Sequence, residues 1–192
     1  MYWFRKSKKL SGTALHILLL FAGTAVLFSC GSGSSDTTAT KENTYFDTKA
    51  FFDQELKRLH TEKPEILKTV KKDQEEETKS VTIKDWKTEL TSFLEVDLKK
   101  PVYNGEFIIE KEGNKEIYRS QNPELDIQEV ILLRKEGKIQ EIQIHKQIGN
   151  MLYKTRENLV YKKDAYYRIE KEQNIRVMGT NHYTIQGNFK KQ

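Results

Sequence analysis

The second half of this chain, behind Pro101, consists of short stretches rich in β-branched and aromatic residues that are separated by turn signals. The signals recur at intervals of roughly 8 to 15 residues, a spacing typical of an antiparallel meander. They include Gly113-Asn114, Glu136-Gly137, Gly149-Asn150 and Lys163-Asp164. The predicted strands are 102–110, 115–120, 127–134, 139–148, 151–161, 165–170, 175–178 and 182–189. Because tight turns join antiparallel neighbours, this half of the chain predicts one antiparallel sheet.

Two of the predicted strands differ in their hydrophobic pattern. In 139–148, the residues Ile142, Ile144 and Ile148 alternate with polar residues, which gives one dry and one wet face. The run 130–133 is Val-Ile-Leu-Leu and does not alternate. It predicts a central strand covered on both sides, one of them by a helix that contains Trp86. The apolar side chains expected to form a solid core under the helices include Ile108, Ile131, Leu133, Ile142, Ile144, Leu159 and Ile169.

The first half of the chain predicts two helices. Phe46, Ala50, Phe52, Leu56 and Leu59 fall near helical spacing, with Thr44 or Asp47 available as the N-cap and Pro64 beyond the end. In the second helix, Asp85 can act as the cap and Pro101 stops it. Its stripe of i, i+4, i+7, i+8 and i+11 positions is Trp86, Leu90, Phe93, Leu94 and Asp97. We expect these aromatic residues, Trp86 among them, to be core residues rather than a surface for ligands.

Between these two helices, the segment 65–83 is ambiguous. Glu75 to Glu77 suit a helix, whereas the β-branched residues around Val70 and Val81 favour a hairpin that turns near Lys72-Asp73-Gln74, and we expect the hairpin. Residues 44–192 number 149, a length typical of one domain with one sizeable core. The sequence therefore predicts a single α+β domain over 44–192, in which N-terminal helices pack on one curved antiparallel sheet.

The N-terminus has the pattern of an export signal. Four basic residues, Arg5, Lys6, Lys8 and Lys9, precede an apolar run of 15 residues from Ala14 to Phe28. As a helix this run would reach only about 22 Å, short of the roughly 30 Å of a bilayer core, so a signal peptide over 1–29 is preferred to a membrane-spanning helix. Leu27-Phe28-Ser29-Cys30 resembles the lipobox of bacterial lipoproteins. That resemblance implies cleavage before Cys30 and a diacylglyceryl group on its thiol.

The residues after Cys30 predict a tether and a location. Residues 30–43 would comprise the lipidated cysteine and a flexible linker, because eight of the thirteen residues from Gly31 to Asn43 are Gly, Ser or Thr. Gly31 stands where the resemblance places an aspartate in lipoproteins retained in the inner membrane, so it implies the outer membrane, on the periplasmic side. Acyl chains on Cys30 would make the membrane the first partner.

The net charge of +5 is concentrated in the predicted signal peptide. Without its four basic residues the chain retains 29 Lys and Arg against 28 Asp and Glu. A surface so evenly mixed offers no concentrated basic face for nucleic acid, and we expect no nucleic-acid partner. Cys30 is the only cysteine, so its acylation would leave no thiol for a disulfide, a metal or a nucleophile.

Around the second predicted helix, the chain is similar to a group of uncharacterised Bacteroidota lipoproteins. The similarity rests on Asp85-Trp86, Glu89-Leu90, Phe93, Asp97 and Lys100-Pro101, spaced as D-W-x-x-E-L-x-x-F-x-x-x-D-x-x-K-P before a β-rich half. It implies no enzymatic activity, and no residue can be assigned a catalytic role from it.

No pattern behind Cys30 predicts enzyme chemistry. His60, His145 and His182 lack metal-pair spacing, and metalloprotease, P-loop, nucleophile-elbow and dinucleotide motifs are absent from the sequence. His145 and Glu141, which share a strand face, would lie roughly 13 Å apart. Asp85 is explained as a helix cap and Glu89 as an exposed first-turn acid. The run 162–168 could stack on sugars or single-stranded nucleic acid, but we expect its tyrosines to have buried rings and solvated hydroxyls.

These observations predict a lipid-anchored envelope protein whose domain is a non-enzymatic binding or assembly module for an unidentified protein or a small apolar molecule. We expect no catalytic residue, cofactor or metal, and Cys30 as the one modified residue. The alternative is a carrier or receptor for apolar molecules, because helices against a curved antiparallel sheet resemble the half-barrel of the Lol lipoprotein carriers. An enzymatic function is the weakest of the three readings.

Overall fold

The computed structural model describes residues 44–190. The predicted signal peptide, Cys30 and the linker therefore lie outside the described residues. The described residues belong to one compact unit. Every residue of the described hydrophobic core lies between Tyr45 and Phe189, so a fragment that begins at Ala39 retains that core.

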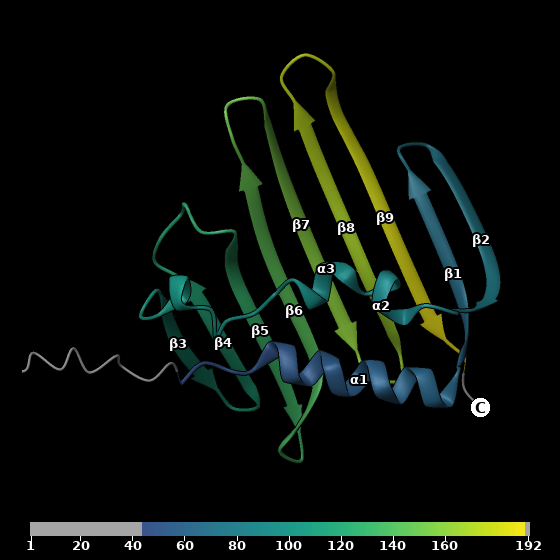
Figure 1. Cartoon of the computed structure of the whole chain (residues 1–192), viewed down its shortest axis with the longest axis horizontal. Coiled ribbons are helices and arrows are strands. Elements are labelled where there is room, and N and C mark those ends of the chain that lie inside the picture. The colour runs from purple at the N-terminus through teal and green to yellow at the C-terminus, as the bar shows by residue number, and fades with distance from the viewer. Residues whose placement is uncertain (1–43, 191–192) are drawn as a thin grey trace, which may run out of the picture. The chain divides into compact units, whose positions relative to one another are not determined.

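Nine antiparallel strands form one sheet in the order β2-β1-β9-β8-β7-β6-β5-β4-β3 (Figure 1). From β3 to β9 the sheet is a simple meander, as predicted, and the first hairpin joins it where β1 pairs with β9. The strands are β1 (Glu65–Lys72), β2 (Glu75–Thr82), β3 (Phe107–Glu112), β4 (Lys115–Ser120), β5 (Ile127–Lys135), β6 (Lys138–Gly149), β7 (Tyr153–Lys162), β8 (Tyr166–Ile175) and β9 (Gly179–Phe189). The α+β class with a single antiparallel sheet is confirmed.

The first predicted helix is confirmed as α1 (Thr48–Glu62). Asp47 is its N-cap, and the Asp47 Oδ1 atom accepts a hydrogen bond of 2.8 Å from the Ala50 amide. The helix ends at Lys63, which is left-handed, just before Pro64. A helix cannot readily continue through the residue that precedes a proline, so both ends follow from local chemistry.

The second predicted helix is wrong in its length. The structure has two single turns, α2 (Trp86–Glu89) and α3 (Thr91–Leu94), and a separate 3₁₀ turn, η1 (Pro101–Tyr103). The Thr91 hydroxyl donates to the carbonyls of Lys87 and Thr88, which weakens the helical turn at this point. Past Leu94 the chain leaves the helix and buries Val96 and Leu98, two residues outside the predicted stripe.

Three strand predictions also need correction. The strand predicted over 151–161 begins only at Tyr153, so Met151 and Leu152 lie in the preceding loop. The strand predicted over 102–110 begins only at Phe107, because Val102 belongs to η1. Residues 175–178 do not form a strand of their own; β8 continues to Ile175, and β9 begins at Gly179. The residues from Glu170 to Asn174 are polar on both faces of this strand, so they carry no alternation by which the sequence could have shown that β8 continues.

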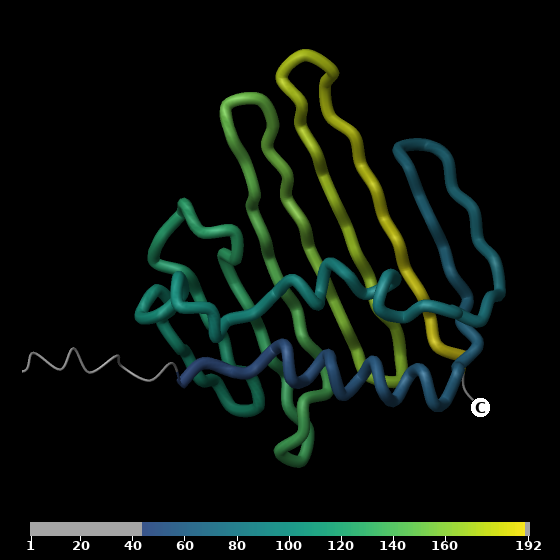
Figure 2. Tube along the Cα trace, viewed as in Figure 1, coloured from purple at the N-terminus to yellow at the C-terminus, as the bar shows by residue number. Residues whose placement is uncertain are grey.

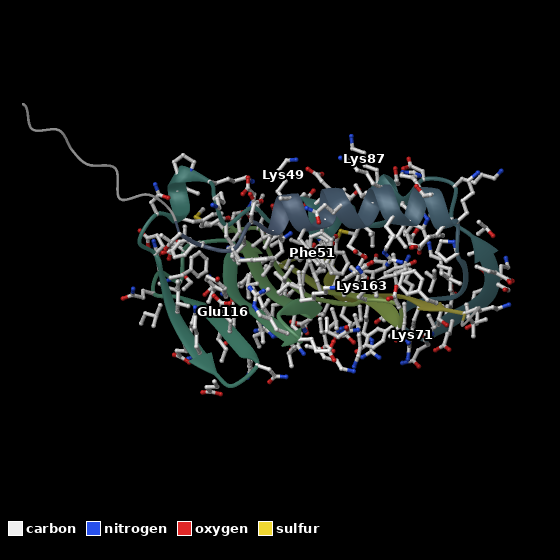
Figure 3. All side chains as sticks on the ribbon, turned by 90° about the horizontal axis from the view of Figure 1, so that it is seen from below. Lys49, Phe51, Lys71, Lys87, Glu116 and Lys163 are labelled. Carbon is white, nitrogen blue, oxygen red and sulfur yellow. The ribbon has the colours of Figure 1, made fainter. Side chains whose placement is uncertain are left out.

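The helices lie across one face of the sheet, which we call the inner face (Figure 1). Phe51 of α1 points towards the sheet, whereas Lys49 and Lys87 point away from it (Figure 3). The rings of Phe52, Phe93 and Tyr161 pack against one another with centroids 5.2 to 6.1 Å apart. Side chains of α1, α3 and β7 thus fill the space between the helices and the sheet.

Trp86 is completely buried, as predicted, over β8 and β9. Its indole stacks on Phe189 at 5.9 Å and meets Tyr167 edge-on at 6.1 Å. Gly187 makes room for the Tyr167 ring, because a Cβ atom at this position would lie 2.2 Å from a ring carbon. The prediction that the helix containing Trp86 covers the run 130–133 in β5 is therefore wrong.

Of the apolar residues expected in the core under the helices, Ile108, Ile131 and Leu133 are the exceptions, because they lie on the outer face. Ile108, on the edge strand β3, is exposed. Ile142, Ile144 and Leu159 are buried on the inner face as expected, and Ile169 is partly buried against the core. Val130, Ile131 and Leu132 are all buried, so this part of β5 is covered on both faces.

Candidate functional site

Strands β6 to β9 extend well beyond the helices and leave part of the inner face uncovered (Figure 1). Where α2 ends and α3 begins, a groove of about 210 Å³ separates them from these strands. We call it the ion-pair groove; its lining residues are Thr88, Glu89, Thr91, Ser92, Glu157, Ile169, Lys171, Tyr183 and Ile185. The volume is below the roughly 300 to 1,000 Å³ of typical small-molecule pockets, so the groove suits a side chain or a short segment.

A three-residue ion cluster lies in and beneath the ion-pair groove. The buried Glu157 carboxylate contacts the Nζ atoms of Lys146 at 2.9 Å and Lys171 at 3.1 Å. Burial alone would raise the pKa of Glu157, but the hydrogen bonds and charges of Lys146 and then Lys171 hold it below its usual value. Lys146 is almost fully buried, whereas Lys171 remains partly exposed. Glu157 is therefore ionised at neutral pH, and its ion pairs hold the three side chains in position.

Glu89 anchors the opposite wall of the groove. Its carboxylate accepts hydrogen bonds from the Tyr167 hydroxyl at 2.5 Å and from the Lys68 Nζ atom at 2.7 Å. Burial, together with the Glu89 carboxylate, raises the pKa of Tyr167 well above its usual range. Glu89 was expected as an exposed first-turn acid, but its side chain is only 12% exposed. The partners that bury it come from β1 and β8, far away in sequence.

A second buried carboxylate, Glu55, joins α1 to β7 away from the groove. It accepts hydrogen bonds from the Tyr161 hydroxyl at 2.7 Å, from Arg58 at 2.8 Å and from Lys163 at 3.1 Å. Burial opposes the charge, yet these three donors together hold the pKa of Glu55 below its usual value. Donors from α1, β7 and the residue that follows β7 share this carboxylate, so it holds α1 on the sheet.

The remaining predicted carboxylates have local structural roles. Asp85 caps α2, as expected: its Oδ1 atom accepts from the amides of Lys87 and Thr88. The hydrogen bonds from Thr88, led by its hydroxyl, lower the pKa of Asp85. The Asp97 side chain accepts a hydrogen bond of 2.9 Å from the Lys99 amide. Both acids are thus engaged in local hydrogen bonds to the backbone.

The histidines lie apart from one another. His60 is exposed on α1, and His145 and His182 lie on the polar outer face of β6 and β9. The His145 Nδ1 atom lies 2.8 Å from the Asn158 side chain, and its Nε2 atom lies 3.7 Å from Glu129. These neighbours belong to β7 and β5. The sequence analysis considered only Glu141, on the same strand as His145, and so could not identify them. Within residues 44–190, no group of His, Cys, Asp or Glu is arranged to hold a metal ion.

The run 162–168, for which stacking was the less favoured alternative, is divided between the two sheet faces. Tyr167 is buried on the inner face, while Tyr166 lies on the outer face beside Arg168. Buried tyrosine rings were expected, but their hydroxyls are not simply solvated. Those of Tyr118, Tyr161 and Tyr167 each donate to a glutamate, namely Glu116, Glu55 and Glu89.

The outer face also carries a shallow hollow of about 340 Å³, lined by Arg156, Asn158, Glu170, Lys171, Glu172, His182, Tyr183 and Thr184. Arg156 pairs with Glu172 across it at 3.2 Å, so this surface is a mixed polar one. The described chain can thus offer fixed charges and hydrogen-bonding groups for non-covalent recognition.

The predicted lipidation site, Cys30, lies outside the described residues. Among the described helices, none has the length and apolar character needed to cross a bilayer.

Comparison of the chain with protein-family models, with curated proteins and with solved structures finds no match.

Proposed function

We propose that this chain is a lipid-anchored protein of the bacterial cell envelope that acts by non-covalent binding of an envelope partner. Cys30 carries the acyl chains, residues 31–43 form the tether, and the domain presents the helix-free part of its sheet to the partner. The lipobox Leu27-Phe28-Ser29-Cys30 supports the anchor. Gly31 behind the cysteine supports the outer membrane, facing the periplasm.

One structural observation supports binding as the activity: the inner face of β6 to β9 continues past the helices and bears ionised groups in fixed positions. Lys171, which is 40% exposed, is held by an ion pair with the buried Glu157, and Glu89, at the adjoining end of α2, is held by two donors. Groups fixed in this way are preorganised for recognition, because ordering them on binding costs little entropy. A catalytic acid or base would instead need a proton-transfer partner directed at a substrate.

The alternative, a half-barrel carrier of apolar molecules, requires a lasting apolar cavity between the helices and a curved sheet. The contacting rings of Phe52, Phe93 and Tyr161 occupy that space with the protein's own side chains. The packing therefore favours a binding module over a carrier.

We expect the soluble fragment 39–192, purified from a bacterial host, to contain no stoichiometric lipid. The reason is the filled space between α1, α3 and the sheet. Native mass spectrometry under mild conditions checks this directly. A fatty acid or phospholipid retained one-to-one would contradict the solid core and make the carrier the preferred function.

We expect Cys30→Ala to abolish acylation and release the protein from the membrane fraction. Without its thiol the chain cannot accept a diacylglyceryl group, and the acyl chains supply the stable attachment, at about 0.8 kcal/mol for each buried methylene. Metabolic labelling with an alkyne fatty acid, followed by fractionation, measures both effects. Ser29→Ala is the matched control, because a small residue before the cysteine is retained. Unchanged labelling and fractionation of Cys30→Ala would refute the anchor.

A further inference from the structure

Two neighbouring hairpin loops lie at the end of the sheet that is away from α1 (Figure 2). The loop between β6 and β7 presents Met151 and Leu152, which are 87% and 69% exposed. The loop between β8 and β9 presents Val177 and Met178, which are 93% and 78% exposed. We call these four residues the apolar tip. Single exposed apolar residues are common, but four gathered on two adjacent loops indicate a contact surface.

Hydrogen bonds hold the apolar tip in its exposed position. The Asn150 side chain accepts from the amides of Leu152 at 2.8 Å and Tyr153 at 3.2 Å, which closes the first loop. The Arg176 amide donates to the Leu152 carbonyl at 3.1 Å and so joins the two loops. The side chains are therefore presented together by one small rigid platform, which reduces the ordering cost of docking.

The fold does not require apolar residues at these positions. The turn chemistry resides in the Asn150 side chain and in Gly179, whose φ of +85° favours glycine. The four tip side chains lie outside the hydrophobic core. Polar residues would satisfy both loops equally well, as they do in the Asp73-Gln74 turn between β1 and β2. The apolar side chains thus point to an apolar environment outside this chain.

The charges around the apolar tip indicate which environment this is. Lys154 and Arg176 flank the two loops and are exposed, and residues 149–154 and 175–180 include no acid. Among residues 44–190, the side chains of Lys154 and Arg176 form no ion pair. The acids Glu124 and Asp126 line a hollow beside Lys154, but neither forms an ion pair with it. Cations without an ion-pair partner beside protruding medium-sized apolar groups match an anionic bilayer surface, where phosphates lie directly above the acyl chains.

We propose that the apolar tip docks on an anionic phospholipid surface, with Met151, Leu152, Val177 and Met178 inserted among the headgroups and Lys154 and Arg176 at the lipid phosphates. This contact is separate from acylation of Cys30 and is testable without it. In a protein that is also tethered by acyl chains, even a weak contact of this kind orients the domain, because the tether keeps the tip at high local concentration.

The test uses the soluble fragment 39–192 and sedimentation with vesicles of phosphatidylcholine alone or mixed with phosphatidylglycerol. We expect binding to the mixed vesicles that weakens with salt. The fourfold variant Met151→Ser/Leu152→Ser/Val177→Ser/Met178→Ser should bind at least about tenfold more weakly, since several apolar groups are lost. Leu67→Ser/Ile108→Ser is the matched control, because it removes two exposed apolar side chains from the outer face of β1 and β3.

The charge component has its own pair of variants. Lys154→Gln/Arg176→Gln should weaken binding to the mixed vesicles by about fivefold for each residue, since a cation near an anionic surface contributes about 1 kcal/mol. Lys135→Gln/Lys138→Gln, at the exposed hairpin between β5 and β6, should leave binding unchanged. All variants alter exposed side chains, so their thermal midpoints by circular dichroism should equal that of the unmodified fragment.

Insertion itself can be observed with a fluorophore. The fragment contains no cysteine, so Val177→Cys gives a unique site for an environment-sensitive label. Its emission should shift to the blue on mixed vesicles, whereas a label at Lys138→Cys, at the other end of β6, should not respond. The proposal is overturned if the folded fragment ignores both kinds of vesicle, or if the fourfold variant binds as well as the unmodified fragment. A stoichiometric protein complex that the fourfold variant loses, without any vesicle binding, would make the tip a protein interface instead.

Discussion

Replacing Trp86 by alanine should lower the unfolding free energy of fragment 39–192 by about 3 to 5 kcal/mol, the range seen when large buried aromatic residues are truncated. The indole is completely buried and fills the junction between α2 and the β8–β9 pair. Its loss would open a cavity against Phe189 and Tyr167, and Tyr167 cannot simply move away because its hydroxyl is held by Glu89. The residues around the cavity can therefore move to fill only a small part of it.

The measurement is urea unfolding followed by circular dichroism, with a shifted midpoint and an unchanged slope as the expected result. Trp86→Phe is the matched control. Among the described residues the indole Nε1 atom has no hydrogen-bond partner, so phenylalanine loses volume but no hydrogen bond, and its effect should be clearly smaller. An unchanged midpoint for Trp86→Ala would show that the residue is dispensable for folding and would favour a role in binding.

The sequence predicted those elements whose signals are local. The helix α1 has a side-chain cap at Asp47 and a proline behind its end, and both act within a few residues. The hairpin between β1 and β2 turns at Asp73, a residue with positive φ, as its turn chemistry suggested. The break between α2 and α3 at Thr91 was missed, and so was the early end of α3, which depends on where Val96 and Leu98 find space in the core.

The candidate sites were harder to predict because their residues meet through the sheet register. Lys146 and Glu157 are cross-strand partners of β6 and β7, and Glu89 meets Lys68 only because β1 pairs with β9. Neither contact leaves a motif in the sequence. The apolar tip was concealed for a different reason: Met151, Val177 and Met178 are apolar and next to strands, so they were assigned to strands rather than to exposed turns.

Replacing Glu157 by leucine should destabilise the fragment by about 3 kcal/mol, through the charge that it leaves behind on Lys146. Removing one member of a buried ion pair costs roughly 3 to 5 kcal/mol, and the lower end applies because Glu95 remains 3.5 Å from the Lys146 Nζ atom. Lys171 contributes little to this penalty, since it is 40% exposed and can turn towards solvent. Lys146→Met should cost clearly less, because Glu157 then keeps Lys171 as its partner.

The double variant Lys146→Met/Glu157→Leu removes both charges but keeps a similar side-chain volume, so it separates the effect of charge from the effect of packing. Apolar residues of similar volume often replace a buried ion pair without loss of stability. The unfolding free energy of the double variant should therefore be close to that of the unmodified fragment and well above that of Glu157→Leu alone.

Acid titration gives a second readout. The pKa of Glu157 is lowered in the folded state, so its contribution is fully present above the usual value of about 4.5 and is lost as the pH falls through the folded pKa. The unmodified fragment should therefore lose stability below about pH 4.5 more steeply than the double variant does. An equally steep loss of stability with falling pH in both proteins, or a double variant as unstable as Glu157→Leu, would show that the Lys146–Glu157 ion pair does not determine the stability of this part of the sheet.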